Sequence, residues 1–192
     1  MADFTKVAIM KTFLEYLNKK PFNKITVKDI VKDTGVNRNT FYYHFTDIYD
    51  LLEKTVSYSL NNLHLNEYRG EDYRALLEMF LGNVQKQKEA ALHIYNSIDL
   101  KIFIPTLRRV LWEATEKYFT PMFDEKNISE QDRHFFLTCI TDLLIGFGLE
   151  WAERNFNEDF TKELMDRVIY WLDKIQNLGT SQKSETKNDA QE

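Results

Sequence analysis

The chain has 192 residues, of which 43% are hydrophobic and 29% are charged, with only 6 glycines and 3 prolines. These proportions are typical of a folded globular protein and exclude the collagen-like and low-complexity classes. The longest unbroken apolar run, Leu143–Leu149, is far shorter than the ~20 residues of a membrane-spanning helix, so no membrane helix is expected. Because the single cysteine, Cys139, cannot form an internal disulfide and the first residues do not resemble a signal peptide, we expect a reducing, cytoplasmic location.

Charge is distributed unevenly along the chain. The whole sequence has a formal net charge of −5, which taken alone argues against a nucleic-acid partner. Residues 1–46, however, contain eight lysines and arginines against four acids, so they carry +4 and the remaining residues carry −9. A basic module on an acidic body is one arrangement expected of a protein that binds nucleic acid through one part only. Ordinary solvated helix faces also produce differences of this size, so the charge needs support from a motif.

Local signals predict the first two helices. Apolar residues at every third or fourth position, together with scarce glycine and proline, predict an all-α fold. The first helix is expected to end before Pro21, because the residue that precedes a proline disfavours helical dihedrals. Thr26 and Asp29 have the spacing of an N-terminal capping box, and Gly35 can end a helix with a positive φ. These signals predict a second helix over about residues 27–34.

Two further helices are predicted directly after this one. Asn37 is a good N-cap for a third, short helix over about residues 38–44. Thr46 or Asp47 caps a fourth and longer helix that reaches toward Asn66. Later helical patterns cover about 72–86 and 90–99, a segment opened by Pro105, a long helix capped by Ser129 and a last helix around 164–175, with a loop over 120–129 and a polar tail from Gly179.

The second and third helices, joined by a short turn in a basic module, match a helix-turn-helix, whose second helix lies in the DNA major groove. Arginine can bind guanine through two hydrogen bonds, asparagine can do the same with adenine, and hydroxyl or imidazole groups can donate to phosphates. Phe41 and Phe45, four residues apart, are expected to face the core. The alternative is a tight helical corner whose tyrosines only cover that core. The candidate DNA-contacting residues are Thr26, Lys28, Asn37, Arg38, Asn39, Thr40, Tyr42, Tyr43 and His44.

Substitutions separate these roles. Arg38→Ala is expected to relax the base preference, because it removes a contact to a base edge. Tyr42→Phe is expected to weaken binding to all sequences, because it removes a phosphate contact.

The order of residues in this region resembles the DNA-binding module of TetR-family transcriptional regulators. The resemblance extends over about residues 3–55 and comprises Ile25-Thr-Val-Lys-Asp-Ile30, Thr34-Gly-Val36, Arg38-Asn-Thr-Phe-Tyr-Tyr-His-Phe45 and Leu51-Leu52. It implies an all-helical homodimer with a three-helix DNA-binding head, a connecting fourth helix and a larger C-terminal domain that binds an effector and dimerises. The corresponding divisions are residues 1–46 for the DNA-binding domain, 47–178 for the C-terminal domain and 179–192 for a disordered tail.

One position departs from the family pattern. Members commonly carry a lysine that meets the DNA backbone a few residues after the His-Phe pair, and this chain has Ile48. Lys24 or Lys28 can supply compensating charge, and Ile48 can support packing of the fourth helix. The Arg38–Phe45 run, followed by Asp47-Ile-Tyr-Asp-Leu51, also resembles the branch of the family that includes regulators of dihydroxyacetone kinase genes.

The C-terminal body has more apolar helix surface than one small domain can cover, which suggests a subunit partner. Gly146 and Gly148 would let a second helix approach closely, or they are simply tolerated inside a core. Two linked heads would then read half-sites about one helical turn, ~34 Å, or a multiple of it apart. The predicted dimer interface contains Phe136, Leu143, Gly146, Phe147, Trp151, Val168, Trp171 and Leu172. Candidate effector-binding residues, chosen as aromatic or polar side chains on the middle helices, are Phe80, His93, Tyr95, Phe103, Trp112 and Phe136.

No enzymatic motif accompanies these features. The sequence has no His-Glu-x-x-His, Cys-x-x-Cys or glycine-rich phosphate loop, so neither a metal nor another cofactor is expected. The leading hypothesis is therefore a dimeric, sequence-specific DNA-binding regulator, more typically a repressor, controlled by a small-molecule or protein effector. The alternative is a helical dimerisation or adaptor protein, or an activator that needs a co-activator because its own DNA binding is weak. Salt dependence separates the two, since phosphate contacts make DNA affinity fall steeply with salt.

Overall fold

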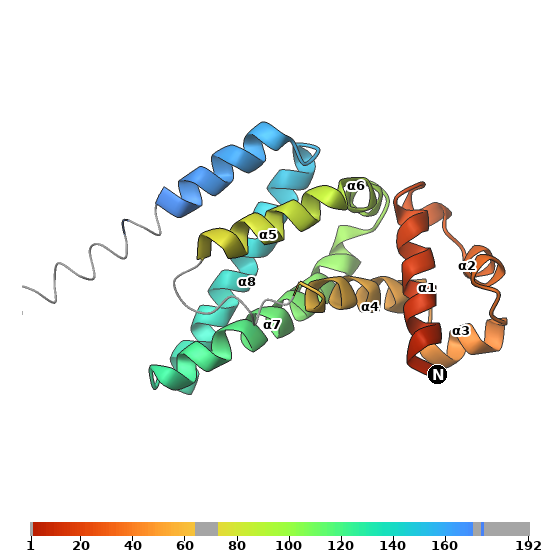
Figure 1. Cartoon of the computed structure of the whole chain (residues 1–192), viewed down its shortest axis with the longest axis horizontal. Coiled ribbons are helices and arrows are strands. Elements are labelled where there is room, and N and C mark those ends of the chain that lie inside the picture. Colours follow the sequence, from red (N-terminus) through yellow and green to blue (C-terminus); the bar gives the residue numbers. More distant parts are fainter. Residues whose placement is uncertain (1, 64–72, 171–173, 175–192) are drawn as a thin grey trace, which may run out of the picture.

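The structure, a computed structural model, describes residues 2–63, 73–170 and 174. These residues form helices joined by short connections, with no strand among them, which confirms the all-α prediction. The elements are α1 (Ala2–Leu17), the 3-10 turn η1 (Phe22–Lys24), α2 (Val27–Thr34), α3 (Arg38–His44), α4 (Ile48–Asn61), α5 (Tyr73–Lys86), α6 (Lys88–Tyr95), α7 (Leu100–Glu125), α8 (Glu130–Glu153) and a last helix over residues 158–170. We call α1–α3 the head and the helices from α4 onward the body. Figure 1 shows the head at one end of an elongated molecule.

The caps predicted for α2 and α3 are present. The Thr26 hydroxyl accepts from the Asp29 amide at 3.2 Å, and the Asp29 carboxylate accepts from the Thr26 amide at 3.1 Å, which completes the capping box. Gly35 ends α2 with φ of 70°, a conformation that costs glycine little. Asn37 caps α3 by accepting from the Thr40 amide at 2.8 Å. Both helices therefore have the predicted bounds.

The core of the head is completed by the body. Phe41 and Phe45, predicted to face inward, are buried among α1, α2 and the first turns of α4. Ala90 from α6 and Ile98, which precedes α7, are buried in the same cluster. In Figure 1 α6 lies beside α1. The head thus depends on apolar contacts from residues about 50 positions further along the chain than its last helix.

The prediction that Pro105 opens a helix was wrong, and the loop predicted over 120–129 is confined to residues 126–129. Asp99 caps α7 by accepting from the Lys101 amide at 2.9 Å, and the helix passes through both Pro105 and Pro121. An internal proline removes one N–H and leaves one carbonyl without its helical donor. Both prolines are exposed, so water can bond those carbonyls. Packing of α7 along α8 and α4 offsets the remaining cost and keeps the helix continuous.

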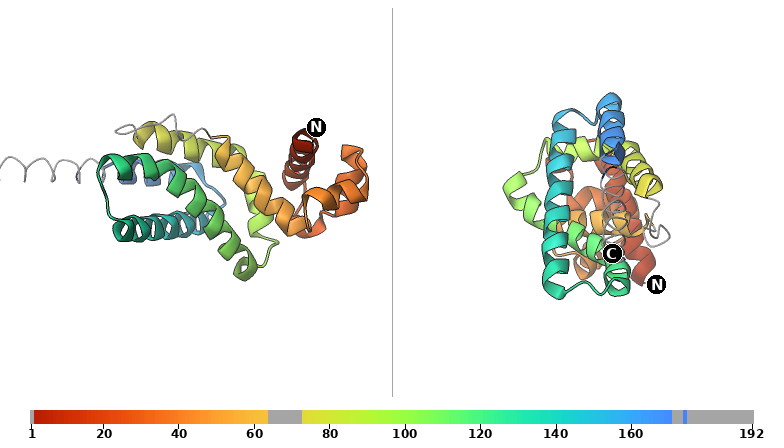
Figure 2. Two further views of the ribbon diagram at one scale, coloured as in Figure 1. Left: turned by 90° about the horizontal axis from the view of Figure 1, so that it is seen from below. Right: turned by 90° about the vertical axis from the view of Figure 1, so that its left-hand side faces the viewer.

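The body is built around the antiparallel pair α7 and α8, seen from two further directions in Figure 2. Thr115 and Thr141 are buried between the two helices, and Arg108 forms an ion pair with Asp142 across them. A separate apolar cluster, which we call the second cluster, joins α5, α6, the end of α8 and the 158–170 helix around the buried Trp151. Ser129 caps α8 as predicted, by accepting from the Asp132 amide.

Candidate DNA-binding site

One side of helix α3 is buried in the core of the head, and the opposite side is exposed to solvent. Phe41 and Phe45 anchor it in the core of the head, with ring centroids 5.5 Å apart. Arg38 and Asn39 in its first turn are exposed, and Tyr42 and Tyr43 have 45% and 78% of their surface exposed. Figure 1 shows α3 at the far end of the molecule from the long body helices. The exposed side of α3 therefore carries guanidinium, amide and phenol groups, which are of the kinds that bind base edges and phosphates.

Asn37 and Thr40, both predicted to contact DNA, are occupied within the head. The Asn37 side-chain oxygen accepts from the Thr40 amide at 2.8 Å and from the Thr40 hydroxyl at 3.0 Å. A bidentate contact to adenine needs that oxygen as an acceptor for the base amino group. Asn37 therefore acts as the N-cap of α3. Of the two candidate asparagines, Asn39 is the one that remains a candidate for binding adenine.

Arg38 and Tyr42 are joined to each other. The Arg38 guanidinium donates to the Tyr42 hydroxyl at 3.3 Å and lies 5.6 Å from the centre of its ring. The Tyr42 hydroxyl was predicted to bind a phosphate. In the structure it also holds the Arg38 side chain, which was predicted to bind a base. Tyr43 differs, because its exposed ring contacts the His44 ring only at its edge, 5.0 Å between centroids.

Two other candidate residues, Thr26 and Lys28, lie at the start of α2. Lys28 is exposed, as its predicted role requires, whereas the exposed Thr26 also uses its hydroxyl as the cap of α2. Lys20 pairs with Asp29 at 3.0 Å, and its hydrogen bond, followed by those from Thr26, lowers the pKa of Asp29. The pair joins the start of α2 to the segment that follows α1.

Two residues of α4 that bond to the end of α3 and its connection, Asp50 and Lys54, were not identified from the sequence. The Lys54 ammonium donates to the carbonyl of His44, the last residue of α3, at 3.0 Å, and to Asp50 at 2.8 Å. The His44 side chain, predicted to contact DNA, is half-buried beside the Phe45 ring. The i,i+4 spacing of the acid and the lysine was a visible signal for a helix pair, but not for a bond to another helix.

The candidate effector residues do not gather around one cavity. Phe80 and Tyr95 lie together against the second cluster, where burial and then the Glu153 carboxylate raise the pKa of Tyr95. Phe103 instead packs against the core of the head. His93 donates from Nδ1 to the carbonyl of Leu17 at 2.6 Å, which joins α6 to the end of α1.

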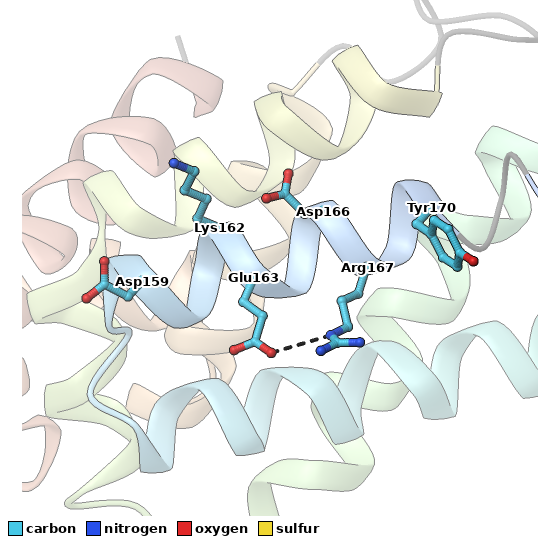
Figure 3. A pocket seen from close by; sticks show the side chains of 6 residues that line it. All are labelled: Asp159, Lys162, Glu163, Asp166, Arg167 and Tyr170. Atoms are coloured by element: carbon cyan, nitrogen blue, oxygen red, sulfur yellow. Dashed lines mark hydrogen bonds and ion pairs between the residues drawn. The ribbon is translucent and has the colours of Figure 1, made fainter.

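The other two candidates lie along α7 and α8. The Trp112 ring contacts His134, with centroids 5.0 Å apart. Phe136 packs edge-on against Phe119 and Phe123, at 4.9 and 5.5 Å. A surface recess of about 530 Å³ elsewhere on the body contains none of the six, since Asp159, Lys162, Glu163, Asp166, Arg167 and Tyr170 line it, all from the 158–170 helix (Figure 3). The structure thus distributes the six residues over separate places.

Most described members of the predicted dimer interface lie on one exposed face of α8. Phe136, Leu143 and Phe147 are 39%, 54% and 42% exposed, and a Cβ added to Gly146 would meet nothing within 4 Å. Trp151 corrects the prediction, because it is only 3% exposed and packs inside its own chain against Phe156, 5.0 Å between rings. On the last helix Val168 is half-buried, while Trp171 and Leu172, like the tail, lie outside the described residues.

Helix α8 also has the length and apolar composition of a membrane span, contrary to the expectation from unbroken apolar runs. Among the described helices it is the one that meets this test, and 28% of its apolar segment is buried within the chain. Length and apolar composition alone do not distinguish such a span from the core helix of a soluble protein. Three of its exposed apolar side chains, Phe136, Leu143 and Phe147, belong to the predicted dimer interface, whereas Phe135, 70% exposed, does not. Within the described part of the chain, no group of three or more metal-ligating side chains comes together.

Comparison with known proteins supports the same interpretation. Residues 9–55 match the model of the bacterial regulatory proteins of the tetR family, and residues 71–174 match a TetR model for the C-terminal region of transcriptional regulators. The chain belongs to the TetR family. TetR proteins are DNA-binding transcription regulators that typically act as dimers, and they are generally not enzymes.

Solved structures of other regulators have the same TetR fold. The dihydroxyacetone kinase operon activator DhaS is similar over 88% of this chain and 93% of its own, with a TM-score of 0.60 and 20% identity. A transcriptional regulator from Aquifex aeolicus VF5 is similar over 88% of this chain and 99% of its own, with a TM-score of 0.53 and 20% identity. A TetR-family regulator from Pectobacterium atrosepticum is similar over 91% of this chain and 93% of its own, with a TM-score of 0.53 and 14% identity. No curated protein matches the sequence.

Proposed function

We propose that this TetR-family protein is a homodimeric repressor that binds a palindromic operator in the cytoplasm. The observation that carries the proposal is α3, which presents Arg38, Asn39 and Tyr43 outward above two fully buried phenylalanines. Repression requires only that the bound dimer occupies DNA that the polymerase needs. The two heads and their linkage are sufficient for that role.

An effector on the body changes the DNA affinity in this proposal. The support is the position of α6, which contributes Ala90 to the core of the head and Tyr95 to the second cluster. A small molecule or protein that shifts α6 therefore alters the packing under the head. Regulation of this kind requires that the effector bind two states of the protein with different affinity.

The decisive experiment is selection of bound fragments from random duplex DNA by the purified protein, followed by a salt titration of the best sequence. A palindromic consensus, with affinity that falls steeply as salt rises, is the expected result. A folded dimer that enriches no sequence at any salt would contradict the proposal. Transcription in vitro from a promoter overlapping the consensus then tests the sign, since repression predicts less transcript when the protein is added.

The second candidate is an activator that works through a partner protein. Its specific support is the likeness to DhaS, which is described as an operon activator, and the dispersal of the six candidate effector residues. This candidate predicts weak operator binding by the purified protein, strengthened by a protein partner, and more transcript rather than less. The same transcription experiment therefore separates the two.

A further inference from the structure

The connection between α3 and α4 determines how the recognition helix is oriented. Only Phe45, Thr46 and Asp47 separate the two helices. The last carbonyls of any helix lack donors within that helix, so they need partners from outside. At the end of α3 the partner comes from α4, because the Lys54 ammonium donates to the His44 carbonyl at 3.0 Å.

Asp50 completes this connection from the same helix. Its carboxylate accepts from the Thr46 amide at 2.8 Å and from Lys54 at 2.8 Å. Partial burial acts to raise the pKa of Asp50, but hydrogen bonds from Lys54 and Thr46 outweigh it, and the pKa is lowered. The carboxylate is therefore charged at neutral pH. The Asp50–Lys54 ion pair of α4 is therefore bonded both to His44, the last residue of α3, and to Thr46, the middle residue of the connection.

Lys54 is also poorly placed to act as a free phosphate contact. Its ammonium has three donors, two of which are used by His44 and Asp50, and it lies 5.4 Å from the centre of the Phe45 ring. Its charge is balanced by Asp50 and by the negative end of the α3 dipole. Ile48, at the position where the family pattern has a DNA-contacting lysine, packs against the core of the head.

We propose that Asp50 and Lys54 are positioning residues for DNA recognition, which hold α3 at a fixed angle to α4 through the His44 carbonyl and the Thr46 amide. They act through α3 and do not touch the DNA. This inference rests on the proposed function. The lysine of α4 thus serves the recognition helix and not the phosphate backbone.

The test compares Lys54→Met with Lys28→Met, an exposed lysine of α2, for binding to the selected operator and to unrelated duplex DNA across a salt series. Lys54→Met is expected to weaken operator binding at least about tenfold, as the loss of a charge-assisted hydrogen bond should. Its affinity for unrelated DNA and its salt slope should not change. Lys28→Met should weaken binding to both DNAs and reduce the salt slope by about 0.9, the value for one phosphate contact.

Two results would overturn the inference. A reduced salt slope for Lys54→Met, equal to that of Lys28→Met, would make Lys54 a phosphate contact. Unchanged operator affinity would show that the pair does not position α3. Should Lys54→Met fail to fold, Lys54→Gln replaces it, since the neutral and shorter amide cannot form the ion pair with Asp50, and the same loss of operator affinity is expected. Lys54→Arg keeps the cation and should retain most of the affinity.

A measurement without DNA separates this inference from the proposed function. In Asp50→Ala the Thr46 amide loses its acceptor, so its hydrogen exchange should become faster, while the Thr40 amide, bonded to Asn37, should exchange at the original rate. Unchanged exchange at Thr46 would contradict the inference even if the protein binds no operator. Faster exchange, with no operator binding by the wild type, would contradict the proposed function alone.

Discussion

Arg38 and Tyr42 form a unit on the exposed side of α3, which changes what a substitution at either should do. The sequence suggested that Tyr42→Phe weakens binding to all DNA alike. Because the Tyr42 hydroxyl accepts from Arg38 at 3.3 Å, removing it also releases the guanidinium that is proposed to read a base. The two residues should therefore share one effect on base preference.

A double-mutant cycle tests this coupling. Arg38→Ala is expected to cost about 1–3 kcal/mol at the best operator and to relax the preference at one base pair. Tyr42→Phe should relax the same position to a smaller degree, and the double variant should resemble Arg38→Ala, giving a coupling energy of at least about 0.5 kcal/mol. Tyr43→Phe is the matched control and should leave base preference intact. Additive losses in the cycle would show that the two side chains act independently.

Tyr16 makes the stability of the head sensitive to alkaline pH. Its hydroxyl donates to Asp33 at 2.6 Å, which ties α1 to α2, and this bond, followed by burial and by the charges of Asp33 and Asp29, raises its pKa to about 12. In the unfolded chain the phenol has a pKa of about 10. The folded state therefore holds this proton more tightly, and the stabilisation is complete below pH 10 and is lost as the pH rises toward 12.

The Tyr16→Phe variant isolates this contribution. We expect the wild type to unfold at a higher urea concentration than the variant at neutral pH, and the difference to shrink between about pH 10 and 12. A Tyr16→Phe difference that stays constant across this range would show that the hydroxyl is not bonded to a charged carboxylate.

Single residues could be predicted where their partners are near in sequence. The capping oxygens of Thr26 and Asn37 serve amides three residues away, so spacing alone identified them. Lys54 could not be found in this way, because its bond to the His44 carbonyl depends on the angle between two helices. Asn37 shows a related ambiguity, since the sequence cannot tell whether an asparagine at a helix start caps the helix or reads a base.

At the scale of whole elements, the bounds of α2 and α3 depend on partners near in sequence, whereas the bounds of α7 depend on contacts with other helices. The short helices begin and end where local caps place them. Helix α7 continues through two prolines because α8 and α4 pack along it, and no local pattern reports that packing. For the same reason the sequence could not predict that the six candidate effector residues lie apart, since aromatic side chains at helical spacing do not reveal which helix will face them.

Helix α6 and the turn that follows it are structural parts of the head as well as of the body. Ile98 is buried in the core of the head, and His93 bonds the carbonyl at the end of α1. We expect Ile98→Ala to lower the free energy of unfolding by about 2–5 kcal/mol and to speed hydrogen exchange in α1. Ile102→Ala, at a position 58% exposed on α7, should cost less than about 0.5 kcal/mol. Faster exchange confined to α7 and α8 would contradict this link.

At the scale of the whole molecule, the exposed apolar face of α8 is the feature that a single chain leaves unexplained. Phe136, Cys139 and Leu143 lie three and four residues apart, so they share one side of the helix, and all three are exposed. Exposed apolar patches of this kind mark interaction surfaces. A two-fold pairing of α8 with its copy would cover them and link two heads.

Leu143→Glu should therefore convert the proposed dimer to a folded monomer, because it places a charge in the covered face. Ile102→Glu, an equally exposed substitution on α7, should leave the protein dimeric. Sedimentation measures the mass, and labelling of Cys139, the only thiol in the chain, measures whether the face is covered, with fast reaction expected only in Leu143→Glu. Operator affinity should fall by about 10²–10⁴, since each head then binds its half-site alone. A wild-type chain that sediments as a monomer with a reactive Cys139 would exclude this interface.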